Sequence, residues 1–375
     1  MVALWKKSMG AKRARGCRLE RMQASPQWQG GKFANALPRE EPKLWSATRE
    51  FMVGGSKHRR PTAPLPIVPR TGTDFASGPA SGLRVTWLGH STSLIEIDGH
   101  RVLLDPVFGE RASPIEWLGP KRFHPPPLPL HDLPHIDVVV VSHDHYDHLD
   151  HTTAVTLGKK GLPFVVPLGV GAHLETWGVD AETITELDWW EHTRVGNIEV
   201  SVVPARHFSG RGPTPSDRDH TLWGGIALVG PAHRVYFSGD TAMFPGFTEI
   251  GKRLGPFDIA LIESGAYNQL WRDAHIGPEQ AALAAKMIEA DILLPVHWGT
   301  FDLALHGWTD PVERLLLATR GLDVTITTPR IGESVELGQP LPDERWWPEL
   351  PLDEREIVVS SHLPDELEAQ VLALV

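Results

Sequence analysis

The chain has 375 residues, of which 41% are hydrophobic and 22% are charged, and both values are ordinary for a soluble globular protein. Its single cysteine, Cys17, excludes an intramolecular disulfide framework, so any metal site must use histidines and carboxylates. No apolar run approaches the roughly 18 residues of a membrane span, and the first residues lack the apolar segment of a secretory signal, so we expect a cytoplasmic location.

Charge is distributed unevenly along the chain. Residues 1–80 contain 15 Lys/Arg and 5 Asp/Glu, whereas the remaining residues contain 21 and 42. We expect a basic, proline-rich and partly disordered extension over residues 1–80, a main domain over 81–340, and an acidic extension over 341–375. The basic arm favours peripheral contact with an anionic membrane, although a solvated tail explains its charge equally well. No nucleic-acid partner is expected, because the acidic body opposes a long phosphate track.

The pattern of residues predicts two sheets with helices outside them. The proline-rich segment 60–69 is predicted to be extended rather than packed. Apolar and β-branched runs between turn residues predict strands at Leu83–Leu88, Ser93–Ile97, Arg101–Asp105, Ile136–Val141, Phe164–Pro167, Ile198–Val203, Gly225–Val229, Val235–Ser238, Ile259–Glu263, Ile292–Val296 and Val324–Thr327. Helical patterns cover Pro278–Ile288, Pro311–Thr319 and Leu363–Leu374. A group of strands followed by mixed strands and helices occurs twice, which predicts an αββα sandwich of two mixed sheets.

One H-x-H-x-D-H motif directly follows the strand predicted over residues 136–141. It contains His143, His145, Asp147 and His148. Imidazoles and a carboxylate suit zinc or a similar divalent ion, and a strand end can direct neighbouring side chains at one point. The motif therefore indicates half of a two-metal hydrolytic site, and a solvated turn is the less favoured interpretation.

Three later strands each end in one more potential metal ligand. These ligands are His207, Asp240 and His297, and Asp240 follows a glycine that leaves room for close approach. A single histidine or aspartate at a strand end is more often structural. Seven such residues after apolar strands are hard to explain by packing.

In chain order, this pattern resembles that of the dinuclear hydrolases of the metallo-β-lactamase fold. Longer segments are similar to one branch of that superfamily, the N-acylphosphatidylethanolamine-hydrolysing phospholipase D family. They are Trp87–Ser91, Leu104–Phe108, Arg111–Pro114, Gly119–Phe123, Glu186–Glu191, Ile250–Asp258, Gly265–Tyr267 and His297–Phe301. The metal motif is shared across the superfamily, whereas these segments are specific to the branch. The resemblance covers residues 83–335 and excludes the basic arm and the acidic tail.

The resemblance implies two zinc ions, although other divalent metals would suit the same ligands. It places His143, His145 and His207 on one ion, Asp147, His148 and His297 on the other, and Asp240 between both. The ions would share a hydroxide formed at neutral pH, which Asp147 and Asp240 would hold as catalytic groups. Relatives in the family also suggest a homodimer.

Four further residues are candidates for orienting ligands or contacting substrate. Asp105 ends a strand and could fix the orientation of a ligand imidazole, with a turn cap as the plain alternative; His90 could do likewise or line the site. His275 lies just before the helix predicted from Pro278, where an anionic phosphate is favoured. The resemblance gives His275 a phosphate-contacting or acid-donating role, although a helix cap is an alternative. Tyr146 could direct its phenol at substrate or simply pack.

The expected function is that of a zinc-dependent phosphodiesterase that resembles this phospholipase D family. The bridging hydroxide would attack phosphorus and His275 would assist, which yields phosphatidate and an N-acylethanolamine. The alternative is a metal-dependent hydrolase of a soluble substrate, such as a sugar-phosphate lactone or a small phosphodiester. An apolar groove near Trp117, Phe123 and Trp271 would favour the lipid substrate. The complete ligand set argues against a non-catalytic surface-binding protein.

Overall fold

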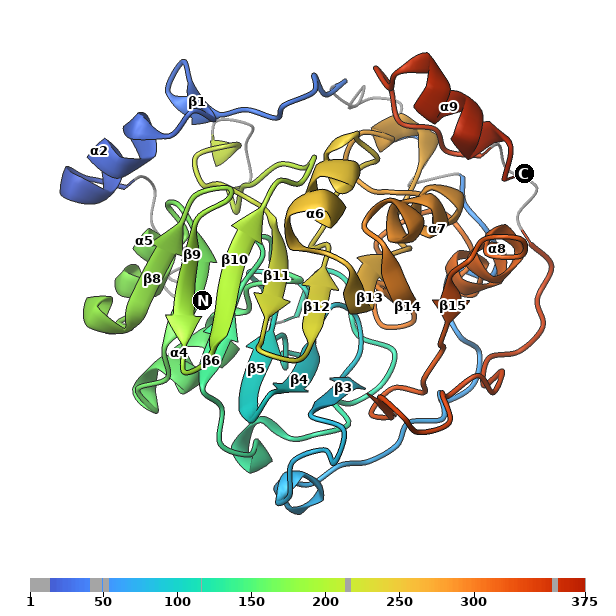
Figure 1. Ribbon diagram of the computed structural model, residues 1–375, viewed down its shortest axis with the longest axis horizontal. Helices are drawn as coiled ribbons and strands as arrows, with labels where there is room; N and C mark the ends of the chain where they lie inside the picture. The colour runs from blue at the N-terminus through green and yellow to red at the C-terminus, as the bar shows by residue number, and fades with distance from the viewer. Residues whose placement is uncertain are drawn as a thin grey trace.

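The computed structural model describes residues 14–40, 49, 54–115, 117–212, 217–352 and 357–374. Within these ranges two seven-stranded sheets lie face to face (Figure 1). The first contains β3 (Leu83–Trp87), β4 (Ser93–Ile97), β5 (His100–Leu104), β6 (Val138–Val140), β7 (Phe164–Pro167), β8 (Ile184–Leu187) and β16 (Ser334–Glu336). The second contains β9 (His192–Val195), β10 (Ile198–Val203), β11 (Gly225–Val229), β12 (Arg234–Phe237), β13 (Phe257–Glu263), β14 (Ala290–Val296) and β15 (Thr325–Ile326).

Both sheets are mixed, as the sequence predicts. The first has the order β16-β3-β4-β5-β6-β7-β8, with antiparallel pairs as far as β5 and parallel pairs beyond it. The second has the order β15-β14-β13-β12-β11-β10-β9, with parallel pairs from β15 to β12 and antiparallel pairs beyond. Strands β8, β9 and β16 were not predicted, because each is short and exposes polar side chains on one face.

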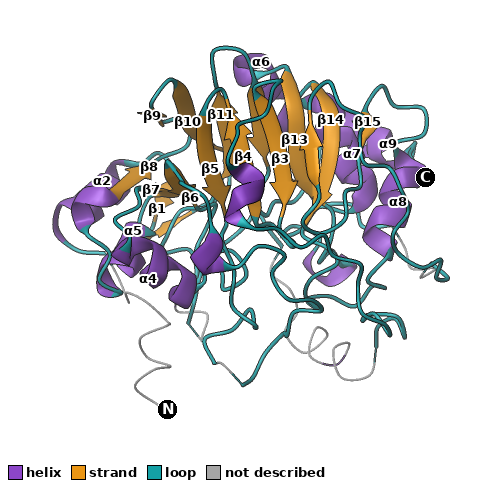
Figure 2. Cartoon of the chain, turned by 90° about the horizontal axis from the view of Figure 1, so that it is seen from below, coloured by secondary structure: helices purple, strands orange, loops and turns teal. Residues whose placement is uncertain are grey.

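Helices cover the outer face of each sheet (Figure 2). They are α4 (His151–Lys159), α5 (Gly171–Thr176), α6 (Gly246–Leu254), α7 (Pro278–Met287), α8 (Asp310–Ala318) and α9 (Asp365–Leu372). Leu157 of α4 and Leu174 of α5 pack against the first sheet, whereas α6, α7, α8 and α9 pack on the second. The predicted αββα sandwich is therefore confirmed, and the helices predicted near residues 278, 311 and 363 are confirmed to within two residues at each end.

The central layer forms because alternate residues of each strand face opposite ways. Val138 and Val140 of β6 point into the cluster between the two sheets, while Val139 and Val141 join the cluster beneath α4 and α5. A strand buried on both faces reads as a continuous apolar run, and this run is what predicted β6.

Strand direction collects many loops at one edge of each sheet. In the first sheet β3, β5 and β6 run the same way, and in the second β10, β12, β13 and β14 do. The residues that follow these strands therefore emerge at common edges. Every predicted metal ligand follows one of these seven strands.

The N-terminal extension packs against the domain wherever the structure describes it. It contains α2 (Gly16–Ala24) and a small hairpin of β1 (Trp28–Gln29) and β2 (Lys32–Phe33), none of which the sequence predicted. Met22 and Phe33 are buried in the central cluster, and the side chain of Trp28 packs against it. The residues Trp5, Lys6, Lys7, Lys12, Arg13, Trp45 and Phe51 lie outside the described ranges.

Acidic residues of the main domain neutralise part of the basic charge of this extension. Arg18 donates to Glu186 at 2.6 Å and to Glu175 at 2.8 Å, and Arg21 donates to Glu191 at 2.5 Å. These ion pairs link α2 to the surface around β8. The charge asymmetry of the sequence is therefore used at least in part within the chain.

The prediction that segment 60–69 is unpacked is wrong. The segment has no regular secondary structure, but Leu65 and Ile67 pack against the central cluster. The backbone amide of Val68 donates to the carbonyl of Ile331 at 2.8 Å. Alternate apolar residues between prolines allow an extended segment to pack against the core. The domain boundaries near residues 80 and 340 stay a prediction.

The acidic C-terminal extension also packs against the domain. Trp346 stacks on Trp298 with ring centroids 5.2 Å apart, and Trp298 stacks on Trp87 at 5.6 Å. Within the described ranges, no helix combines the length and the apolar composition that crossing a bilayer would need.

We predict that the extension contributes to the stability of the domain. Met22→Ala should lower the free energy of unfolding by about 2–5 kcal/mol, because it removes a side chain that is 2% exposed from the central cluster. Gln23→Ala, an exposed change in the same helix, is the matched control and should change it by less than about 0.5 kcal/mol. Urea unfolding measures both, and equal small losses would show that α2 is not packed in solution.

Candidate metal centre

Two ligands from the loop after β6, His143 and His145, converge with His207, which follows β10. The Nε2 atom of His143 lies 2.9 Å from Nδ1 of His145, and Nε2 of His207 lies 3.2 Å from the same Nδ1. Two unprotonated imidazole nitrogens at such distances repel each other unless a proton or a cation lies between them. Nitrogens bound to one tetrahedral zinc at about 2.0–2.1 Å would lie roughly 3.3 Å apart.

Asp240 completes this first set of ligands. Its Oδ2 atom lies 3.7 Å from Nε2 of both His143 and His207. The four ligand atoms of His143, His145, His207 and Asp240 all lie within 4.8 Å of one another. The set offers three imidazoles and one carboxylate oxygen to a single cation.

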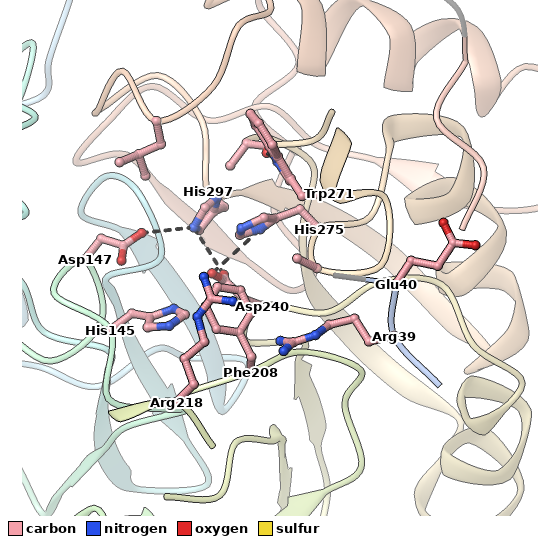
Figure 3. Close-up of a pocket in the computed structure, with 13 residues that line it drawn as sticks. Arg39, Glu40, His145, Asp147, Phe208, Arg218, Asp240, Trp271, His275 and His297 are labelled. Carbon is pink, nitrogen blue, oxygen red and sulfur yellow. Dashed lines mark hydrogen bonds and ion pairs between the residues drawn. The ribbon is translucent and has the colours of Figure 1, made fainter. Parts of the chain in front are cut away.

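The second set lies on the other side of the same aspartate (Figure 3). Oδ1 of Asp240 lies 3.1 Å from Nε2 of His148 and 3.2 Å from Nε2 of His297. Oδ2 of Asp147 lies 3.3 Å from His297 and 3.5 Å from His148. The structure therefore brings all seven predicted ligands together, with one oxygen of Asp240 facing each set.

In the described part of the chain, the hydrogen bonds at the centre leave several ligand atoms unpaired, which fits two bound cations. Nε2 of His148, Nε2 of His297 and Oδ1 of Asp240 are buried and have no hydrogen-bond partner in the described part of the chain. Buried polar atoms without a partner are costly, and coordination to a metal ion satisfies them. Neutral imidazoles and carboxylates are also the ligands that zinc prefers.

Asp105 orients two of the ligand imidazoles. His148 donates from Nδ1 to Asp105 at 2.6 Å, and Ser142 donates from its hydroxyl to the same oxygen at 2.6 Å. Nδ1 of His143 in turn lies 2.9 Å from that hydroxyl. These contacts leave Nε2 of both histidines for the centre, as in other metal sites with hydrogen-bonded ligands. Asp105 thus lies where the sequence placed it, behind a ligand.

His90 contacts a ligand carboxylate. Its Nε2 atom lies 3.0 Å from Oδ2 of Asp147, and its carbonyl accepts from the backbone amide of His297. Burial lowers the pKa of His90 to about 3, so its imidazole is neutral and can donate to Asp147. A ring nitrogen of His90 also lies within 4.8 Å of the ligand atoms of Asp147, His148 and His297, although the sequence analysis did not assign His90 to a metal.

The electrostatics of the centre are set by two buried carboxylates. Burial would raise the pKa of Asp147 and of Asp240, but the charge of His148 outweighs it and holds both pKa values well below the usual range. Burial likewise opposes a charge on His297, yet Asp240 raises its pKa to about 10. The lowered pKa values of the carboxylates and the raised pKa of His297 have one cause. The two ionised carboxylates favour positive charge in this cavity, whether protons or divalent cations carry it.

Glu263 is a site residue that the sequence did not identify. It ends β13, is fully buried, and accepts from the backbone amide of Thr241 at 2.5 Å. Its other oxygen lies 2.9 Å from Nδ1 of His275. Burial and the charge of Asp240 raise the pKa of Glu263, and burial lowers that of His275 to about 4. The available signal was its position at the end of a strand next to that of Asp240.

Tyr146 does not face the cavity. Its hydroxyl donates to the carbonyl of Arg211 at 2.5 Å, and the Arg211 guanidinium lies 4.1 Å from its ring centroid. Burial raises the pKa of Tyr146 to about 12. Of the two roles considered from the sequence, the structure therefore gives it packing and not substrate contact, because alternate residues of the motif point away from the metal ligands.

A cavity of about 360 Å³ leads to the centre (Figure 3). Its wall is partly apolar, with Phe208, Ala266, Trp271, Ala274 and Leu303, and its rim carries Arg39, Glu40 and Arg218. Of the three aromatic residues considered from the sequence, Trp271 lines this cavity. Trp117 is instead 67% exposed on a loop, and Phe123 lines a smaller neighbouring cavity.

Both chain extensions hold the backbone beside His207. Asn35 donates to the carbonyl of His207 at 2.8 Å and accepts from its amide at 3.0 Å. The buried Arg206 pairs with Asp273 at 3.1 Å, and it donates to the carbonyls of Pro38 and Ser361. These contacts could not be predicted from the sequence, because residues with no shared motif make them over long separations.

Comparisons with known proteins agree with this geometry. A family model described as a beta-lactamase superfamily domain matches residues 100–298. An uncharacterised Mycobacterium tuberculosis protein is 47% identical, covering 86% of this chain and 87% of its own. The N-acyl-phosphatidylethanolamine-hydrolyzing phospholipase D 1 of Caenorhabditis elegans is 40% identical, covering 72% of this chain and 79% of its own. Among solved structures, the metallo hydrolase Igni18 from Ignicoccus hospitalis superposes with a TM-score of 0.54 at 22% identity, over 69% of this chain and 99% of its own. The fold is that of the metallo-β-lactamases.

We predict that Asp105→Asn weakens zinc binding by about 10- to 100-fold, because it disturbs the orientation of His148 and His143. Competition with a chromogenic chelator measures the affinity. Asp98→Asn is the matched control, since Asp98 accepts from His233 at 2.7 Å in another part of the fold. Equal affinities for the two variants would contradict the orienting role of Asp105.

We also predict that the two ligand sets can be emptied separately. His145→Ala should leave about one zinc per chain, because it removes a ligand of one set only, whereas Asp240→Ala should affect both sets. Metal analysis of the purified variants by mass spectrometry gives the stoichiometry. Two zinc ions retained in Asp240→Ala would contradict the shared position of this carboxylate.

Proposed function

Because this chain is a metal-dependent hydrolase that belongs to the N-acylphosphatidylethanolamine-hydrolysing phospholipase D family of the metallo-β-lactamase superfamily, we propose that it is a dinuclear zinc phosphodiesterase. We propose that it cleaves N-acylphosphatidylethanolamine to phosphatidate and an N-acylethanolamine. The observation that carries the proposal is the position of Asp240, with one oxygen toward each of two complete ligand sets.

The residues present define what each set would hold. One zinc would be bound by His143, His145, His207 and Asp240, and the other by Asp147, His148, His297 and Asp240. Bound there, two zinc ions acidify water to a nucleophile at neutral pH and neutralise charge on phosphoryl oxygens. Asp105 and His90 keep the ligands in place, as their contacts above support.

His275 would act on the substrate itself. It lines the cavity and lies 3.8 Å from Oδ2 of Asp240, with Glu263 fixing its ring from behind. Because burial lowers its pKa to about 4, the imidazole is neutral near pH 7 and is suited to hydrogen bonding with a phosphoryl or leaving-group oxygen. A proton for the leaving alkoxide would then pass along the Glu263–His275 contact.

The cavity wall supports a substrate with an apolar part. Phe208, Trp271 and Leu303 offer contact to an acyl chain, which a sugar-phosphate lactone or a small phosphodiester lacks. The named activity of the relative in Caenorhabditis elegans supports the same substrate. Peripheral membrane contact through the basic arm, weakened by salt, and a homodimer are part of this proposal.

The direct test is incubation of the zinc-loaded protein with N-acylphosphatidylethanolamine, followed by mass spectrometry of the lipids. Both phosphatidate and N-acylethanolamine should appear, and Asp240→Ala should form neither. Free fatty acid as the product would reject the proposed bond cleavage. Turnover restricted to lactones or small diesters would instead favour the soluble-substrate alternative.

We predict that His275→Ala lowers kcat by about 10²- to 10⁴-fold, since it removes the group placed to assist the leaving oxygen. The zinc content should not change, because Nδ1 of His275 lies 2.9 Å from Glu263 but 3.8 Å from the ligand Asp240, and His275 belongs to neither assigned ligand set. His135→Ala, at a histidine whose side chain is 75% exposed, is the control and should keep full activity. An unchanged kcat for His275→Ala would remove this residue from the mechanism.

A further inference from the structure

Two arginines flank one aromatic ring at the mouth of the cavity. The guanidinium carbon of Arg39 lies 4.7 Å from the ring centroid of Phe208, and that of Arg218 lies 5.4 Å from it. Arg39 comes from the N-terminal extension and Arg218 from the loop between β10 and β11. Figure 3 shows both side chains near Phe208, with Arg218 reaching toward Asp240.

Phe208 links these arginines to the metal ligands. Its ring centroid lies 4.6 Å from that of His145 and 4.7 Å from that of His207. The two guanidinium groups are therefore separated from the ligand imidazoles by one aromatic ring. A phosphodiester whose phosphate is held at the centre would place one of its two esterified groups beside Phe208 and the two arginines.

Two guanidinium groups line this part of the cavity, although the protein carries a formal net charge of −11. Arg39 forms an ion pair with Asp219 at 3.7 Å, and Glu40, which also lines the cavity, accepts from Arg272 at 3.0 Å. A guanidinium that stacks on a ring uses its face, while its N–H donors lie in the plane at its edge. Two such groups beside a cationic metal centre favour anionic and neutral ligands over cationic ones.

We propose that Arg39 and Arg218 determine specificity by reading the charge of the group esterified to the scissile phosphate. Neutral or anionic groups are accepted, and groups that carry an ammonium are rejected. This inference rests on the proposed function and deepens it. Acylation of an ethanolamine nitrogen removes its positive charge, so the arginine pair separates an N-acylated phospholipid from its zwitterionic parent.

Aromatic residues of the same cavity allow the opposite expectation for an ammonium group, so one measurement can decide between the two. Phe208 and Trp271 could bind a quaternary ammonium by cation–π contact, as aromatic cages do. Repulsion by two arginines predicts that an ammonium weakens binding, whereas an aromatic cage predicts that it strengthens binding. The sign of one affinity ratio therefore separates the two.

The experiment uses two ligands that differ only in charge. Phosphocholine and its uncharged isostere 3,3-dimethylbutyl phosphate are titrated calorimetrically into the zinc-loaded full-length protein. The wild type should bind the isostere about tenfold more tightly or better, since like charges in a partly desolvated site repel. The ratio should fall to about two in the Arg39→Gln/Arg218→Gln double variant and should invert in Arg39→Glu/Arg218→Glu.

The controls separate specificity from structure. Arg320→Gln, at an exposed arginine after α8, should keep the wild-type ratio. Zinc content and thermal unfolding should be the same in the Gln double variant as in the wild type. A wild-type preference for phosphocholine, or one ratio in all variants, would overturn the inference.

Turnover distinguishes this inference from the proposed function. If the wild type cleaves N-acylphosphatidylethanolamine and the double Gln variant gains activity on phosphatidylethanolamine, both stand. If the affinity ratio behaves as expected but no N-acylphosphatidylethanolamine is cleaved, only the proposed function fails. If this lipid is cleaved and the ratio does not respond to the arginines, only the inference fails.

Discussion

Two ionised carboxylates buried among imidazoles are the constraint around which this protein is arranged. Asp240 is buried and the side chain of Asp147 is only 15% exposed, so both carboxylates depend on positive charge within the cavity. Five ligand histidines from three strand ends supply nitrogens for cations that provide it. Asp105, Ser142 and Glu263 then fix the rings from outside, so the surrounding hydrogen bonds serve the same charge balance.

The ligands could be predicted from the sequence because their geometry is encoded locally. His207, Asp240 and His297 each follow an apolar run whose length and β-branching mark a strand. Strands that run in one direction end at one edge, so residues far apart in the chain meet there. The strands from Ser93, Phe164, Ile198 and Gly225 matched their predicted bounds for the same reason: apolar alternation and flanking turn residues agree.

Other parts of the centre could not be predicted, because they depend on contacts with no local pattern. Asn35 reaches the backbone of His207, and Arg39 reaches the cavity, from a segment that has neither strand alternation nor a ligand motif. Glu263 looks like the last residue of an ordinary strand until His275 is placed beside it. Tyr146 shows the converse, since its place in the motif suggested substrate contact while its ring packs on Arg211.

The position of Arg39 has an evolutionary consequence. This residue precedes the stretch from 100 to 298 that the superfamily model matches, whereas all seven ligands fall within it. Residues of the leading segment can therefore differ between proteins that share all seven ligands and the matched stretch. Divergence of this kind would be invisible to any classification built on the ligand motif alone.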